Sequence, residues 1–291
     1  MTSLHFYNLR SRLGMMNLPH RMDEFNIGVE EGGDAILSEE FLLHFPQAVV
    51  DSFTFPLPED IERKKYFEAI VEYSQKAIDL IEETLQDDET QVVIGGDHSV
   101  AFCSLVALLR RLHSHSIGYI QIDSHPDINT IATSPTGNFH GMWMRPFIGG
   151  FENEAVNQLV PHVLKPEQIL YIGNLDLDPE EQEVIDAKKI QILSMKGLRN
   201  SDAQERIQKF MNSFDHIHLD IDIDGFDQSV APGTGIPCDG GLLPHDLQPI
   251  IELFKKKASR SLDLVEVNPQ KDVDEKTVQF AQQIIQDTFG S

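Results

Sequence analysis

The chain has 291 residues, of which 41% are hydrophobic and 24% charged, as is ordinary for a globular protein with a substantial core. It has 47 Asp and Glu against 23 Lys and Arg, and this net charge of −24 disfavours nucleic acid and anionic membrane surfaces as partners. Two cysteines are too few for a disulfide framework or a zinc–thiolate site. The N-terminus lacks a signal-peptide layout and no apolar run approaches the roughly 18 residues that span a bilayer, so we expect a cytoplasmic protein.

The first 90 residues contain one strong helix pattern. Residues 1–60 are rich in turn signals and weakly periodic. The glycines over 26–33 suggest a loop that leads into a short helix, although a plain loop is the favoured interpretation. Residues 61–86 carry apolar side chains at three- and four-residue spacing, which predicts a long amphipathic helix packed on the core.

A short apolar run at 92–94 predicts a buried strand, which leads through a glycine pair and His98 into a helix over 100–112. His98 follows the carboxyl end of the strand, the edge at which α/β sheets collect ligands. The alternative is that a neighbouring Asp or Ser caps the helix and that His98 is incidental. A phosphate-binding loop is excluded because its lysine is missing.

The next strand, at 117–122, ends in the most informative stretch of the chain. Asp123, His125 and Asp127 follow it at every second position. Alternate residues of an extended chain project to one side, so the three side chains can converge on one point. Carboxylates with imidazole and no thiolate favour hard or borderline divalent ions such as Mn²⁺. The alternative is a polar loop whose Asp residues cap the next turn or helix.

A second ionisable stretch, at 216–224, alternates apolar and polar residues like a strand and places Asp220, Asp222 and Asp224 on one face. Both faces of a parallel α/β sheet are covered, so three like charges there would raise one another's pKa unless a cation neutralised them. We therefore favour a metal site over an exposed edge strand.

The remaining elements complete an alternating pattern. Strands are expected at 168–173, 190–193 and 262–267. Helices are expected from about residue 180, over 202–213, after the Gly/Pro loop at 225–237, and after the last strand. This alternation predicts a single three-layer α/β/α domain over residues 1–291 with a mainly parallel sheet. The polar residues fall where strands stop, so the active site is expected at the carboxyl ends of the strands.

Several ordered blocks carry a resemblance to a known family. They are GGDHS at 95–99, DSHPDIN at 123–129, GNFHGM at 137–142, and DIDGFD followed by PGTG and GG over 222–241, with GVEEGG at 28–33 and EVNP at 266–269. In this pattern, which covers nearly the whole chain, the protein resembles the arginase/agmatinase/formiminoglutamase ureohydrolases.

The resemblance implies a binuclear manganese centre. The positions that match the ligands of one Mn²⁺ are His98, Asp123, Asp127 and Asp222, and those that match the ligands of the second are His125 and Asp224, with Asp123 and Asp222 bridging. A hydroxide between the ions would be the nucleophile. Asp127 is therefore expected to be essential for catalysis.

Two further residues match catalytic positions of the family. His140 matches the group that shuttles a proton to the leaving amine, a role that suits an imidazole titrating near neutrality. Glu266 matches the carboxylate that receives the guanidinium group. The alternatives are a satisfied loop histidine and a strand-end glutamate exposed to solvent.

The resemblance also implies an amino-acid pocket. Asn129, Ser134 and Thr136 match positions that bind the substrate α-carboxylate, and Asp178 matches a segment that contacts the α-amino group. Agmatine has no α-amino group and is disfavoured as a substrate. The alternative for Asp178 is a helix cap before a first-turn proline.

The activity closest to this pattern is hydrolysis of L-arginine to L-ornithine and urea, in a homo-oligomer that is a trimer or a hexamer. Formimidoylglutamase or another guanidino-acid ureohydrolase is the alternative, followed by a non-catalytic metal-binding relative. The retained second-metal positions argue against the single-metal deacetylase relatives. The chain departs from common family residues at four positions, which are Leu175 for arginine, Asp220 for serine, Gln228 for proline and Ile236 for threonine.

Overall fold

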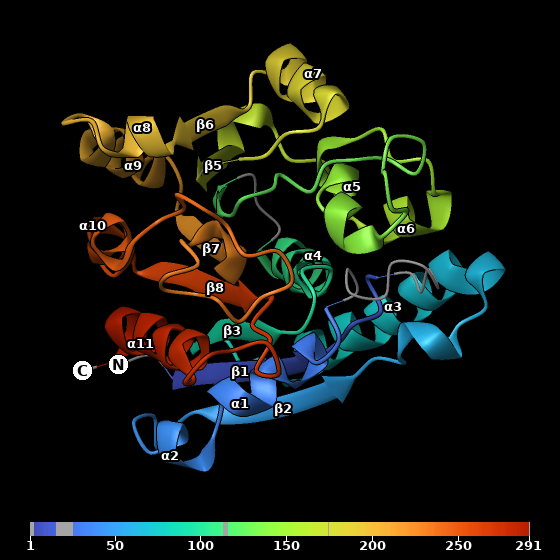
Figure 1. The fold of residues 1–291 in the computed structure, drawn as a ribbon, viewed down its shortest axis with the longest axis horizontal. Coiled ribbons are helices and arrows are strands. Elements are labelled where there is room, and N and C mark those ends of the chain that lie inside the picture. Colours follow the sequence, from blue (N-terminus) through green and yellow to red (C-terminus); the bar gives the residue numbers. More distant parts are fainter. Residues whose placement is uncertain (1–2, 16–25, 113–115, 174, 291) are drawn as a thin grey trace.

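The computed structural model describes residues 3–15, 26–112, 116–173 and 175–290, and it places their strands in one eight-stranded sheet (Figure 1). The order across the sheet is β2-β1-β3-β8-β7-β4-β5-β6, and every pairing is parallel. The strands are β1 (Ser3–Arg10), β2 (Val49–Thr54), β3 (Glu89–Gly95), β4 (Ile117–Ile122), β5 (Ile169–Gly173), β6 (Gln191–Ser194), β7 (His216–Asp222) and β8 (Ser259–Val265). The predicted parallel α/β fold is confirmed.

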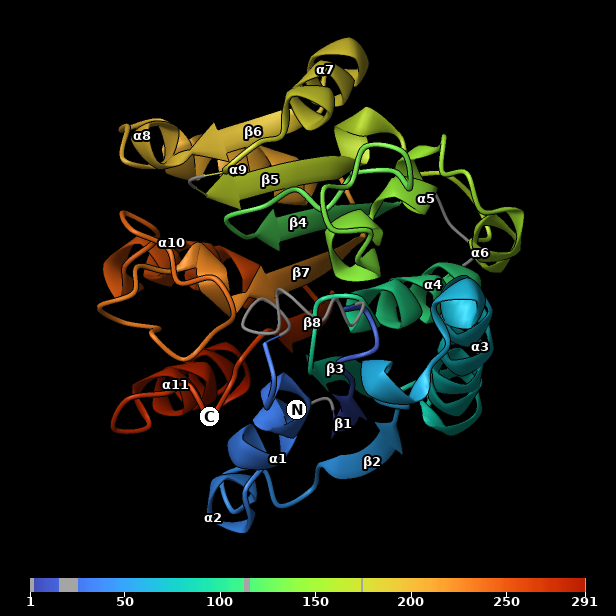
Figure 2. The same ribbon diagram turned by 45° about the vertical axis from the view of Figure 1, so that its right-hand side comes forward.

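Helices cover both faces of the sheet (Figure 2). One hydrophobic core contains apolar side chains of α3 (Tyr66–Thr84), α4 (Val100–Leu112), α5 (Arg145–Ile148), α6 (Glu154–Leu159) and α7 (Pro179–Lys188). The other contains those of α1 (Gly32–Ile36), α2 (Glu39–Leu42), α8 (Met195–Leu198), α9 (Ala203–Asn212), α10 (Pro244–Phe254) and α11 (Lys276–Phe289). Within the described ranges no helix combines the length and apolar character needed to cross a membrane.

The two cores follow from side-chain alternation along buried strands. In β1, Tyr7 and Leu9 belong to one core while Phe6 belongs to the other, and β5 divides Tyr171 and Ile172 in the same way. Strands that are covered on both faces can be apolar at consecutive positions, as β4 and β5 are. The result is the three-layer arrangement that the alternation of strands and helices predicted.

The expectation of turns and one short helix over residues 1–60 is wrong for β1 and β2. Strand β1 carries His5 within its apolar residues, and both imidazole nitrogens have partners 2.9 Å away, Asp51 and Glu89. Strand β2 lies at the edge of the sheet and exposes Val49 and Val50. Polar residues that look like turn signals in the local sequence can lie within a strand when tertiary contacts provide their hydrogen-bond partners. Residues 16–25 of this stretch lie outside the described part of the chain.

Candidate active site

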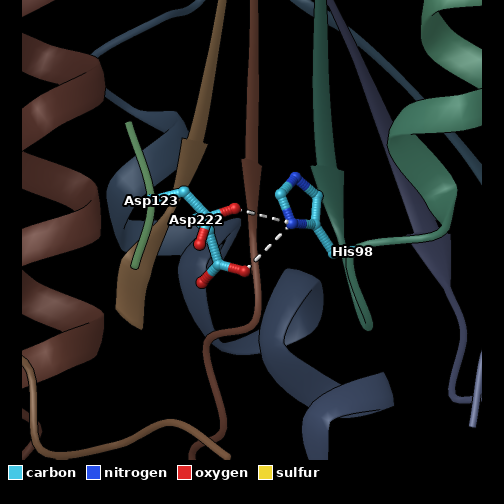
Figure 3. A group of neighbouring side chains, drawn as sticks. All are labelled: His98, Asp123 and Asp222. Carbon is cyan, nitrogen blue, oxygen red and sulfur yellow. Dashed lines mark ion pairs between the residues drawn. The ribbon is translucent and has the colours of Figure 1, made fainter. Parts of the chain in front are cut away.

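The carboxyl ends of β3, β4 and β7 bring buried ligand-type side chains together. His98 follows β3, Asp123 follows β4, and Asp222 ends β7. The Nδ1 atom of His98 lies 3.3 Å from Oδ2 of Asp123 and 3.1 Å from Oδ2 of Asp222 (Figure 3). All three side chains are almost completely buried. Among the residues that the structure describes, these three form one of two groups whose donor atoms could hold a metal ion.

Asp127 joins this group through a turn rather than through an extended strand. Its Oδ2 lies 2.8 Å from Nδ1 of His98 and accepts a hydrogen bond of 3.0 Å from Nε1 of Trp143. Its backbone has φ of 53°, in the left-handed region. The expectation that residues 123–127 continue as extended chain is therefore wrong, although the carboxylate does reach the predicted place.

The second group consists of Asp123, His125 and Asp224. Nδ1 of His125 lies 3.2 Å from Oδ2 of Asp224 and 3.7 Å from Oδ1 of Asp123. The predicted strand face with three aspartates is wrong at its end, because β7 stops at Asp222 and Asp224 lies in the 3-10 helix Ile223–Gly225. Asp123 belongs to both groups, and its two oxygens face different histidines.

Neighbouring donors fix the orientation of these carboxylates. Oδ1 of Asp222 accepts a hydrogen bond from the backbone N–H of Asp224, and Oδ1 of Asp224 accepts one from the Ser124 hydroxyl. The other oxygen of each carboxylate is turned towards a histidine. Asp123 is held by the side chain of Gln121. Such outer partners preorganise a ligand set.

The buried carboxylates of the two donor groups need positive charge nearby to stay ionised. Burial, reinforced by Asp224 and Asp123, raises the pKa of Asp222 well above its ordinary value. Burial would lower the pKa of His98, but the surrounding carboxylates, led by Asp220, raise it well above its ordinary value. The carboxylate forms therefore need cationic partners, either imidazolium or metal.

One atom indicates that a divalent cation fits. Nδ1 of His98 is buried and lacks a hydrogen-bond partner, although it faces three carboxylate oxygens. A nitrogen lone pair and carboxylate oxygens pointing at the same place attract a hard or borderline cation. The residues described here thus suit a metal centre built from oxygen and imidazole donors.

His140 and Glu266 lie together beside this centre. Glu266 is 4% exposed and follows β8, so the alternative of a solvent-exposed strand-end glutamate is wrong. Its Oε1 lies 3.5 Å from Nδ1 of His140 and accepts a hydrogen bond of 2.9 Å from the backbone N–H of His98. Burial would raise the pKa of Glu266, but His140 and these hydrogen bonds lower it. Burial would lower the pKa of His140, but Glu266 raises it.

A residue that the sequence interpretation missed holds the other oxygen of Glu266. The side-chain amide of Asn26 donates a hydrogen bond of 2.7 Å to Oε2, and Asn26 in turn accepts one of 2.6 Å from Asn268. Both Asn26 and Glu266 have positive φ. The available signal was the position of Asn26, two residues before the start of the GVEEGG block that carries part of the resemblance.

A cavity of about 260 Å³ opens over these groups. All four residues predicted to bind substrate line it, as do His140, Glu266 and four of the six predicted metal ligands. The exposed side chain of Ile236 and the buried side chain of Asn26 line it as well. One concave site therefore combines the metal-ligating side chains with polar groups from the loop after β4 and the loop after β5.

The residues of the predicted amino-acid pocket all have hydrogen-bond partners within the two loops. Nδ2 of Asn129 donates a hydrogen bond of 2.8 Å to Oδ2 of Asp178. The hydroxyl oxygens of Ser134 and Thr136 accept hydrogen bonds from backbone N–H groups of the same loop, at 2.9 and 3.2 Å. Asp178 directly precedes α7, with Pro179 in the first turn. The helix-start interpretation and the place in the cavity therefore both hold for this residue.

Glu181 was not predicted, yet it connects the two loops of this pocket. Oε1 accepts a hydrogen bond of 3.2 Å from the backbone N–H of Ile128, and Oε2 accepts one of 3.1 Å from that of Asp178. The side chain is 4% exposed, and burial raises its pKa from 4.5 to about 7. A single glutamate on the cavity wall thus connects the backbone next to Asn129 with that of Asp178.

The raised pKa of Glu181 predicts a pH-dependent stability. Between pH 4.5 and about 7 the folded state holds a proton that the unfolded state has released, so this contribution is complete below pH 4.5 and is lost as the pH rises through 7. The difference corresponds to roughly 3 kcal/mol of unfolding free energy. Glu181→Gln should remove this dependence, as urea unfolding of both proteins at pH 4.5 and 8 measures. Equal pH dependence in the two proteins would show that Glu181 does not titrate in this range.

Comparisons with known proteins agree with this fold. A sequence model of the arginase family matches residues 13–290. An arginase from Bacillus caldovelox is 30% identical over 277 residues, which are 93% of this chain and 87% of that protein. The crystal structure of an Entamoeba histolytica arginase in complex with L-ornithine has a TM-score of 0.87 at 25% identity and covers 100% of this chain and 99% of that chain. A Bacillus subtilis formimidoylglutamase, at 18% identity and a TM-score of 0.71 over 98% of this chain and 85% of that one, shares the fold. The chain belongs to the arginase family, whose members are hydrolases acting on C–N bonds of linear amidines.

Proposed function

We propose that the protein is a binuclear manganese amidinohydrolase that converts L-arginine and water to L-ornithine and urea. The observation that carries this proposal is one cavity in which metal-type donors, Glu266 and the Asn129–Asp178 pair face the same space. The metal-type donors suit hydrolysis, Glu266 suits a guanidinium group, and the Asn129–Asp178 pair suits the charged end of an amino acid.

The charge of the centre supports two divalent ions. Four carboxylates contribute four negative charges, and two divalent cations would balance them; these carboxylates are Asp123, Asp127, Asp222 and Asp224. Asp123 is shared by the two donor groups and would bridge the ions. Oxygen and imidazole donors without thiolate suit Mn²⁺. Ions bound there would supply a water molecule of lowered pKa as the nucleophile.

The side chains of this chain supply the rest of the reaction. Glu266 would pair with the planar guanidinium group, since its pKa is lowered and two donors fix its carboxylate. Water adds to the guanidinium carbon, and the bond from that carbon to the nitrogen that stays on the ornithine side chain breaks, which releases urea. His140, beside Glu266 and one-fifth exposed (22%), would give the leaving amine its proton.

The relatives support arginine over other amidines. Curated relatives at 27–30% identity over nearly the whole chain are arginases, and the Entamoeba protein was solved with L-ornithine. Ornithine has an α-amino group, and Asp178 offers a carboxylate on the cavity wall that could pair with such a group.

The direct test is urea release by the purified protein loaded with Mn²⁺, with L-arginine, agmatine and 4-guanidinobutyrate in parallel. We expect urea from L-arginine and little from the other two. Urea from agmatine or guanidinobutyrate instead would keep the hydrolytic centre and overturn the amino-acid pocket. Formamide from formimidoylglutamate, with no urea from L-arginine, would establish the alternative activity.

Replacing Asp178 should specifically reduce discrimination between arginine and agmatine. Asp178→Ala removes the carboxylate proposed for the α-ammonium group, so kcat/KM for L-arginine should fall by about 10- to 100-fold, as for other lost charged hydrogen bonds. The kcat/KM for agmatine, which lacks that group, should change much less. Measuring both substrates with both proteins gives the ratio. A fall that is the same for both substrates would show that Asp178 acts on the fold of the loop instead.

A further inference from the structure

Asp220 stands directly behind His98, on the side of the ring away from the other carboxylates. Its Oδ2 lies 3.0 Å from Nε2 of His98, while Nδ1 of the same ring faces the metal-type donors. Asp220 is 0% exposed, is absent from both donor groups, and occupies a position where serine is common in the family pattern. Because burial of a carboxylate costs free energy, we expect Asp220 to have a specific role at this position.

The contact determines which nitrogen of His98 carries its proton. A carboxylate only accepts hydrogen bonds, so Nε2 of His98 must be the donor. In the neutral ring Nδ1 then presents its lone pair, and this is the atom that is buried without a hydrogen-bond partner. Oδ2 of Asp127 lies nearest to it, at 2.8 Å. The ring is thus held in the tautomer that binds a cation between Nδ1 and these oxygens.

The surroundings hold Asp220 in place. It lies in β7 between β8 and β4, and its Oδ2 also accepts a hydrogen bond of 2.6 Å from the Tyr119 hydroxyl of β4. Trp143 packs against the His98 ring with a centroid distance of 5.1 Å. Neither the carboxylate nor the imidazole can turn without disturbing buried neighbours.

We propose that Asp220 is a positioning residue of the metal centre, one that fixes the tautomer of His98 and strengthens this imidazole as a ligand. The inference rests on the proposed metal-dependent function. It adds a carboxylate–histidine–metal relay to the ligand set that the family resemblance implies. Asp220 does not touch the substrate cavity, so its effect should reach catalysis only through the ion that His98 binds.

The test compares Asp220→Asn with Asp263→Asn. The asparagine amide is close in shape to the carboxylate, but it lacks the charge and can turn its NH₂ group towards Nε2, which forces the proton onto Nδ1. Asp263 is a second fully buried aspartate, opposite Asp220 in the register of β7 and β8, and its carboxylate contacts Ser104 and His218 instead of His98. Mn²⁺ binding to each protein would be titrated by the electron paramagnetic resonance of free Mn²⁺, with bound metal counted by mass spectrometry.

We expect Asp220→Asn to lower the affinity for one of the two Mn²⁺ ions by about 10- to 100-fold, which is the usual effect of losing such a hydrogen-bond partner of a metal ligand. Asp263→Asn should bind both ions with nearly unchanged affinity, because Asp263 does not contact His98 or the donor groups. Thermal unfolding in a chelator should give similar transitions for the wild-type protein and Asp220→Asn, since a purely structural role would lower that transition. If Asp220→Asn fails to fold, Asp220→Ser, which restores the common family residue, takes its place with the same expected direction.

The outcomes separate the two proposals. Wild-type protein that binds two Mn²⁺ ions, together with Asp220→Asn that binds them equally tightly, would overturn the positioning role and leave the proposed function intact. Equal weakening by both substitutions would also overturn it, because it would reflect general damage to the core. Wild-type protein that binds no Mn²⁺ would instead refute the metal centre itself.

Discussion

Asp123→Ala is expected to remove both metal ions and to abolish measurable urea release. This carboxylate is the one residue shared by the two donor groups, with Oδ2 3.3 Å from His98 and Oδ1 3.7 Å from His125. Loss of an outer-shell partner alone costs about 10- to 100-fold in metal affinity or activity. Loss of a bridging ligand should exceed about 100-fold in kcat/KM. Bound metal by mass spectrometry and urea release from L-arginine measure the two effects.

Asp263→Asn provides a matched control for the loss of a buried carboxylate. Asp263 is also 0% exposed and lies opposite Asp220 in the register of β7 and β8, but its oxygens bind Ser104 and His218, away from the donor groups. It should keep both ions even if its melting temperature falls. Asp123→Ala protein that retains two Mn²⁺ ions, or a control that loses them, would contradict the assignment of Asp123 as the bridge.

Periodicity was a reliable guide where elements are long or buried on both sides. The helix predicted over 100–112 matches α4, and the strand predicted over 117–122 matches β4. Both have regular spacing of apolar residues that tertiary contacts reinforce. Strands β1 and β2 escaped prediction because one carries a paired histidine and the other exposes its apolar residues at the sheet edge. Local patterns cannot show partners that lie more than 40 residues away.

The predicted site residues do meet, but part of their geometry depends on backbone turns that spacing alone did not predict. Asp127 reaches His98 through a left-handed residue, and Asp224 reaches His125 from a 3-10 helix. Asn26 lies 240 residues before Glu266 in the chain, so only the folded structure shows their hydrogen bond. Sequence motifs identified the residue types, whereas the roles of Asn26 and Glu181 follow from contacts between loops.

His140→Ala is expected to lower kcat while leaving the metal centre filled. His140 lines the cavity beside Glu266 but belongs to neither donor group, so its removal should not release ions. Burial would lower the pKa of its imidazole, but Glu266, whose Oε1 lies 3.5 Å from Nδ1, raises it above the ordinary value, which favours the protonated ring that a proton donor needs. Loss of such a proton donor typically reduces rate by about 10²- to 10⁴-fold. Steady-state kinetics with L-arginine, alongside Mn²⁺ content, would give this result.

Added imidazole distinguishes proton transfer from a loss of shape at this position. If His140 donates the proton to the leaving amine, free imidazole in the buffer should restore part of the kcat of His140→Ala, because the cavity left by the ring opens towards solvent. His140→Asn, which keeps a polar side chain without a group that titrates near neutrality, should be as slow as His140→Ala and should respond to imidazole less because its cavity is smaller. Full kcat in either variant would refute the proton-donor role, and loss of Mn²⁺ in both would instead place His140 among the residues that hold the metal centre together.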